Sequence, residues 1–133
     1  MKKIVRILLR ALKFPKGEID FLFLSPAYMA TYNKKYLDRP GPTDVISFPV
    51  GDFPSGVGGL HPLGDIVICL RVVERYAKKH GIDRGEELTR VIIHGILHLL
   101  GYDHDVKKRE TIMKRKEEDL LKLVGSKWRS LWC

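Results

Sequence analysis

A nearly uninterrupted apolar helix is the feature that most constrains how this chain can fold. Asp83 can cap its N-terminus, Glu86 sits at the capping-box position and Gly101 can end it, so we predict a helix over residues 84–100. Its apolar side chains are Leu88, Ile92, Ile93, Ile96, Leu97, Leu99 and Leu100. They lie around most of the circumference, which is typical of a helix surrounded by other elements. We therefore expect this helix to be buried inside the domain.

Strands and helices alternate along the rest of the chain. The pattern predicts strands over residues 18–24, 44–50 and 65–70, and helices over residues 26–37, 71–81 and 105–125. The last helix is predicted to pack through Ile112, Leu120, Leu121 and Val124. Residues 2–14 fit either a short amphipathic helix or a first strand. We expect one domain over residues 1–133, with helices packed on a small sheet in an α+β or α/β arrangement.

Two further features concern the sheet. Pro49 has no N–H to donate to a ladder, which favours an edge position for the strand over residues 44–50. Residues 51–64 are rich in glycine and proline and predict a long loop, a feature that is more often functional than accidental in a small domain.

The net charge of the chain narrows the classes of molecule that it is expected to bind. A formal net charge of +8 and a pI of about 9.6 favour a polyanion such as nucleic acid, or an anionic membrane surface. No apolar run approaches the ~20 residues that span a bilayer. The basic N-terminus is unlike a signal peptide, because arginines interrupt its apolar part. Cys69 and Cys133 form no disulfide framework. We expect a cytoplasmic protein without a membrane partner.

Three histidines follow a spacing that suits a metal. His94 and His98 are four residues apart on the predicted helix and project from one face, and the turn at Gly101 can return His104 to the same point. Three neutral imidazoles around one Zn²⁺ leave a fourth position open, as in catalytic rather than structural zinc sites. Asp103 is a candidate for orienting a ligand imidazole.

Gly95, the residue after the first histidine, is evidence on the class of substrate. The stretch "HGILHLLGYDH" follows the zinc-protease pattern HExxHxxGxxH, but Gly95 stands where a protease has its general-base glutamate. Peptide hydrolysis needs a proton shuttle to the amine leaving group, whereas phosphodiester cleavage gains more from cationic stabilisation, and RNA brings its own 2′-hydroxyl. The motif therefore points away from proteolysis and toward a phosphodiester.

These segments resemble one family. "HGILHLLGYDH", "PTDVISFP" and "LGDIVIC" are similar in order and spacing to motifs of the YbeY endoribonucleases, bacterial rRNA maturation factors. The resemblance implies an α+β fold with a mixed sheet of about four strands and a metzincin-like core around an active-site helix. It implies zinc, one ion per chain, on His94, His98 and His104. It also implies single-strand endoribonuclease action in 16S rRNA 3′-end maturation and ribosome quality control, with the small ribosomal subunit and ribosomal or GTPase proteins as partners.

One position departs from the family pattern. Many members carry a catalytic arginine directly after a tyrosine shortly before the "PT" strand, but here Tyr36 is followed by Leu37. Arg39 is the nearest arginine and is either a replacement or a solvated loop charge. The sequence also fits two alternative functions. One is a non-enzymatic ribosome assembly factor that contains zinc, and the other is a zinc peptidase without the usual glutamate.

Overall fold

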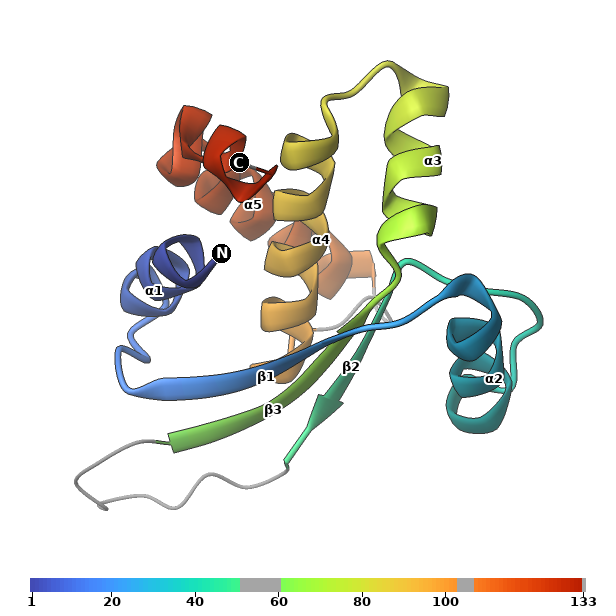
Figure 1. The fold of residues 1–133 in the computed structure, drawn as a ribbon. Helices are drawn as coiled ribbons and strands as arrows, with labels where there is room; N and C mark the ends of the chain where they lie inside the picture. Colours follow the sequence, from blue (N-terminus) through green and yellow to red (C-terminus); the bar gives the residue numbers. More distant parts are fainter. Residues whose placement is uncertain (51–60, 103–106, 133) are drawn as a thin grey trace.

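The computed structural model of this chain describes residues 1–50, 61–102 and 107–132. These residues form an α+β fold in which helices pack around a three-stranded mixed sheet (Figure 1). The α+β class expected from the sequence is confirmed. The elements are α1 (Lys2–Ala11), β1 (Gly17–Phe23), α2 (Pro26–Leu37), β2 (Val45–Pro49), β3 (His61–Ile68), α3 (Leu70–His80), α4 (Arg84–Leu99), α5 (Lys107–Val124) and the 3₁₀ segment η1 (Gly125–Trp132).

The sheet has the order β1-β3-β2, so β3 lies in the centre. β3 pairs with β1 in parallel and with β2 in the antiparallel sense. Ile66, Val67 and Ile68 are all buried, which agrees with the apolar run that predicted a strand covered on both faces. β2 is an edge strand, as Pro49 predicted.

Several elements differ from the expectation. The described residues contribute three strands where about four were expected. Of the two alternatives for residues 2–14, the structure has the helix, over Lys2–Ala11, with Ile4, Leu8 and Leu9 on one buried side. β3 begins at His61 rather than at residue 65, since its pairing with β1 already starts at Gly17; the predicted loop therefore ends before His61, and residues 51–60 lie outside the described part.

The last helix packs through Leu120, Leu121 and Val124 as predicted, but not through Ile112. Ile112 is half exposed, and its neighbour Met113 is fully buried. Met113, Leu120 and Val124 recur at a helical spacing and form the inner side of α5. This phase decides which polar residues of α5 face α4.

α4 is the central helix of the domain, as predicted. Ile92, Ile93, Ile96 and Leu97 are each no more than 1% exposed and belong to the main core. In Figure 1, α4 lies between α1 and α3, with α5 behind it. The Asp83 side chain caps α4 by accepting a hydrogen bond from the Gly85 N–H at 2.7 Å. Within the described residues, no helix combines the length and apolarity that a membrane crossing requires.

Candidate metal centre

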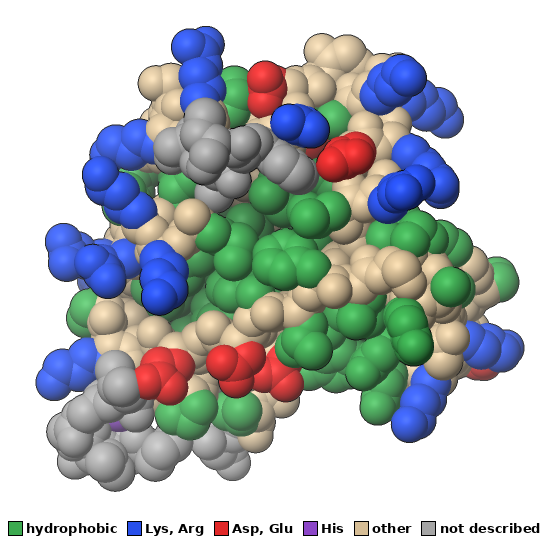
Figure 2. Space-filling model, in the orientation of Figure 1, with side chains coloured by type: hydrophobic (Ala, Val, Ile, Leu, Met, Phe, Trp, Pro, Cys, Tyr) green, Lys and Arg blue, Asp and Glu red, His purple; other side chains and the backbone are tan. Residues whose placement is uncertain are grey.

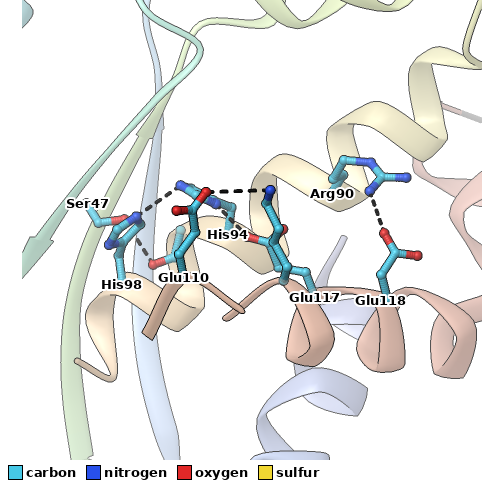
Figure 3. Close-up of polar contacts among 9 residues, drawn as sticks. Ser47, Arg90, His94, His98, Glu110, Glu117 and Glu118 are labelled. Carbon is cyan, nitrogen blue, oxygen red and sulfur yellow. Dashed lines mark hydrogen bonds and ion pairs between the residues drawn. The ribbon is translucent and has the colours of Figure 1, made fainter. Parts of the chain in front are cut away.

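His94 and His98 lie on consecutive turns of α4, and their imidazole rings approach each other. Residues four apart on a helix lie ~6 Å apart along the axis and on one face. The two Nε2 atoms are 2.9 Å apart, and the ring centroids are 4.5 Å apart with the planes at 72°. Figure 3 shows both imidazoles on the same side of the helix. The pair thus presents two nitrogens that converge on one position.

Glu117 of α5 fixes the orientation of His94. Its Oε1 lies 2.6 Å from Nδ1 of His94, and its side chain is 15% exposed (Figure 3). An ionised carboxylate can only accept, so Nδ1–H is the donor in this bond. A neutral imidazole has a single N–H, which leaves a lone pair on Nε2 of His94. In this tautomer, the unprotonated Nε2 of His94 faces Nε2 of His98.

This arrangement fits a metal in its donor set and its support. Two nitrogens at about 2.0–2.1 Å from one tetrahedral zinc lie roughly 3.3 Å apart. The observed 2.9 Å is a few tenths of an ångström shorter, which small rotations of the rings can supply. A histidine ligand usually donates its second N–H to a carboxylate, and Glu117 is that carboxylate for His94.

The third predicted ligand, His104, and its neighbour Asp103 belong to a segment that the structure does not describe. Within the described ranges, no group of three His, Cys, Asp or Glu side chains is arranged to hold a metal. The structure therefore brings together two of the three predicted ligands, and the third remains a prediction.

Gly95 lies against the sheet. A Cβ at this position would be 3.1 Å and 3.2 Å from two carbons of Ile66 and 3.3 Å from Oγ of Ser47. The Ser47 hydroxyl also donates to the Gly95 carbonyl at 2.9 Å, which ties β2 to α4 beside the histidines. Any side chain at this position would therefore require Ile66 and Ser47 to shift by at least a few tenths of an ångström.

A cleft of about 470 Å³ opens between α2, β2 and the two histidines. Its lining comprises Asn33, Leu37, Arg39, Thr43, Asp44, Val45, Ile46, Ser47, Pro49, His94 and His98. Arg39 and Leu37 therefore share a cavity with the histidines. Buried Asn33 holds the segment after α2 in place by donating from Nδ2 to the Gly41 carbonyl at 2.8 Å.

A second cavity of about 240 Å³ also borders His94. Asp44, Glu87 and Glu117 line it, together with Tyr76, Val45, Arg90 and Val91. Glu87 is 4% exposed, and its Oε2 is buried with no hydrogen-bond partner. Burial raises the pKa of this carboxyl; nearby Arg90 opposes the shift, whereas Asp44 and Glu86 add to it. The carboxyl therefore keeps its proton to a higher pH than an exposed glutamate does.

Glu117 was missed by the sequence reasoning, which assigned no role at the site to any residue of the last helix. A signal was present in its spacing. Glu117 follows Met113 by four residues and precedes Leu120 by three, and both of these are buried. A carboxylate in the middle of an apolar stripe is expected to have a partner on the neighbouring helix.

Comparison with known proteins decides the family. The family model described as "Endoribonuclease YbeY" matches residues 1–125. The chain belongs to the YbeY family. An Endoribonuclease YbeY of Pelotomaculum thermopropionicum is 39% identical over 108 residues, which cover 80% of this chain and 71% of that protein. One of Mycolicibacterium smegmatis is 40% identical over 113 residues, covering 80% of this chain and 64% of that protein. The chain thus spans roughly two thirds of these YbeY relatives.

A solved structure shares the fold. The solution structure of TM1509 from Thermotoga maritima matches with a TM-score of 0.69 and 28% sequence identity. The match covers 97% of this chain and 81% of TM1509. The arrangement of helices around the sheet is therefore not particular to this chain.

Proposed function

We propose that this chain is a zinc-dependent endoribonuclease that cleaves single-stranded RNA during rRNA processing, including 16S 3′-end maturation, and that it acts in ribosome quality control. The observation that carries this proposal is the convergence of the His94 and His98 Nε2 atoms at the wall of a cleft that also contains Arg39. Membership of the YbeY family supports an RNA substrate.

Each residue has a distinct role in this proposal. His94, His98 and His104 hold zinc, one ion per chain, and Asp103 orients one of these ligands. When bound, zinc supplies a positive charge that stabilises the negative charge developing on the phosphate. Glu117 keeps Nε2 of His94 deprotonated and aimed into the cleft. Arg39 contributes a second positive charge on the same cleft, where it can donate to phosphate oxygens.

The cleft also explains why the substrate is a nucleic acid and not a peptide. Gly95 leaves no carboxylate at the general-base position of a peptidase, and a Cβ there would already be in tight contact with Ile66 and Ser47. Protonation of an amine leaving group is therefore not provided there. A phosphodiester needs the positive charges that this cleft does provide.

The setting of the reaction follows from the same family. We propose that residues 1–133 act as one domain in a bacterial cytoplasm, on ribosomal RNA and in contact with the small ribosomal subunit. Ribosomal proteins or a GTPase are the protein partners that the family resemblance suggests.

Cleavage of an rRNA precursor tests this proposal. Purified wild-type protein is compared with His98→Ala and with His80→Ala, which removes an exposed histidine of α3. We expect the wild type and His80→Ala to cut a single-stranded 16S 3′ precursor and His98→Ala to lose at least about 10²-fold in rate. Equal cutting by all three would indicate a contaminating nuclease. Binding without cutting by the wild type would support the assembly-factor reading.

A further inference from the structure

The net charge of this protein is concentrated at its N-terminus. Residues 1–16 contain six of the 24 Lys and Arg and none of the 16 Asp and Glu. The other 117 residues carry 18 basic against 16 acidic side chains, which nearly balance. Most of the formal net charge of +8 therefore belongs to α1 and the turn after it. A uniformly basic surface kept for solubility would not be divided in this way.

α1 presents its cations along one side. At about 100° per residue, its four basic positions fall within an arc of roughly 100°. These are Lys2, Lys3, Arg6 and Arg10, and all four are exposed. Lys13 and Lys16 extend the exposed row beyond the helix. Figure 2 shows Lys and Arg side chains along the edge of the molecule where Figure 1 places α1.

The cations of α1 have no acidic partner within the described ranges of the chain. Ion pairs within the described ranges include those of Lys34 with Asp38, Arg90 with Glu86 and Glu118, His94 with Glu117, and Lys114 with Glu110. They belong to α2, α4 and α5, where basic and acidic residues are mixed. Glu18 and Asp20 of β1 line a groove together with Lys2 and Arg6, but no ion pair to these cations is formed in the described part of the chain. The row of like charges therefore repels itself, and an external polyanion relieves that repulsion.

The opposite side of α1 excludes insertion into a membrane. Amphipathic helices bind bilayers by burying their apolar side among the acyl chains. In α1 this side is already buried in the protein core through Ile4, Leu8 and Leu9. Only the charged side remains available, and it offers electrostatic contacts alone.

We propose that the cationic side of α1, formed by Lys2, Lys3, Arg6 and Arg10, is a docking surface for the phosphodiester backbone of RNA, separate from the histidine cleft. The choice of RNA as the polyanion rests on the proposed function. No residue of α1 lines either cavity beside His94 in the described structure. The helix is ~15 Å long at 1.5 Å per residue, enough to follow several consecutive phosphates. Such a surface holds a folded part of the RNA while an unpaired segment occupies the cleft.

A paired charge removal tests the position of this surface. Arg6→Gln/Arg10→Gln is compared with Arg75→Gln/Lys78→Gln, which removes the same charge from exposed positions of α3, on the other side of α4 (Figure 1). Both variants are checked for wild-type thermal unfolding. Binding of a fluorescent RNA hairpin with a single-stranded tail is measured over a salt series, with a chelator present to prevent cleavage.

We expect the α1 variant to bind about tenfold more weakly and its slope of log K against log salt to be shallower by about 1 to 2. The α3 variant should lose less than half as much. Equal losses in both variants would show that only net charge matters, and unchanged binding in both would show that neither helix contacts RNA. Either result overturns the docking surface.

Two further measurements separate this proposal from its alternatives. The α1 variant should cut a short single-stranded oligonucleotide with the wild-type kcat, because the cleft is intact. If the wild type binds RNA through α1 but cuts nothing, the proposed function fails and the docking surface stands. Vesicles rich in phosphatidylserine are the second probe: tighter binding of vesicles than of the hairpin at equal salt, lost in the α1 variant, would reassign this surface to membranes.

Discussion

Glu117 of α5 accepts a hydrogen bond from Nδ1 of His94 in α4 at 2.6 Å, so a neighbouring helix sets the tautomer of a candidate metal ligand. The bond joins residues that are far apart in the sequence and depends on how α4 and α5 pack. Its effect is local, because it leaves a lone pair on the Nε2 atom that faces His98.

Glu117→Gln is therefore expected to weaken zinc binding by about 10- to 100-fold, the usual effect of removing the carboxylate behind a histidine ligand. Competition with a coloured zinc chelator measures this affinity. Glu118→Gln is the matched control, since that neighbouring carboxylate pairs with Arg90 instead. Equal affinities for Glu117→Gln and the wild type would remove Glu117 from the metal centre.

Arg39 and Leu37 line the same cleft, which suggests a rescue experiment. Arg39→Ala should lower kcat for RNA cleavage by about 10²-fold, because a charge near the reacting phosphate is lost. Leu37→Arg in the Arg39→Ala background returns an arginine to the family position and should recover at least part of that loss. Wild-type kinetics for Arg39→Ala would make this residue a solvated loop charge.

Gly95→Glu restores the sequence pattern of a zinc peptidase but should not create one. The new side chain would meet Ile66 and Ser47, where even a Cβ is at 3.1–3.3 Å. Overpacking and burial of a carboxylate together should lower the free energy of unfolding by about 3 kcal/mol or more. Chemical denaturation measures this loss. A stable variant that cleaves a peptide in a metal-dependent manner would contradict the packing argument.

Glu87 gives the stability of the protein a pH dependence. Burial raises the pKa of the Glu87 carboxyl in the folded state. Between the ordinary glutamate pKa and this raised pKa, the folded protein therefore binds more protons than the unfolded chain. The free energy of unfolding should therefore fall as pH rises through that window. Glu87→Gln should flatten this fall and stabilise the protein at neutral pH. Urea unfolding between about pH 4 and 8 tests it, with Asp119→Asn, which removes an exposed carboxylate of α5, as the control; parallel profiles for Glu87→Gln and the wild type would oppose the assignment.

The parts of the fold predicted well are those set by local spacing. The i, i+4 relation brings His94 and His98 together whatever surrounds them, and Asp83 and Gly101 delimit α4 by local capping. Pro49 indicated an edge strand because its missing N–H acts at one position.

The parts predicted poorly depend on contacts between distant segments. The start of β3 at His61 follows from pairing with Gly17, which no local pattern contains. In the first half of α5, the sequence pattern chose Ile112 for the core where Met113 is buried, because both residues are apolar. The role of Glu117 follows from the phase of α5. The cleft shared by Arg39 and the histidines likewise requires the path of the chain after α2.

The most direct test of the metal-dependent cleavage site is zinc titration of RNA cleavage after removal of metal by a chelator. We predict that chelated wild-type protein does not cut a single-stranded RNA, and that activity returns in proportion to added zinc and saturates at one ion per chain. His94→Ala and His98→Ala should not recover at that stoichiometry, whereas His80→Ala should behave as the wild type. Cleavage that survives chelation, and that persists in both histidine variants, would contradict a metal-dependent nuclease site on α4.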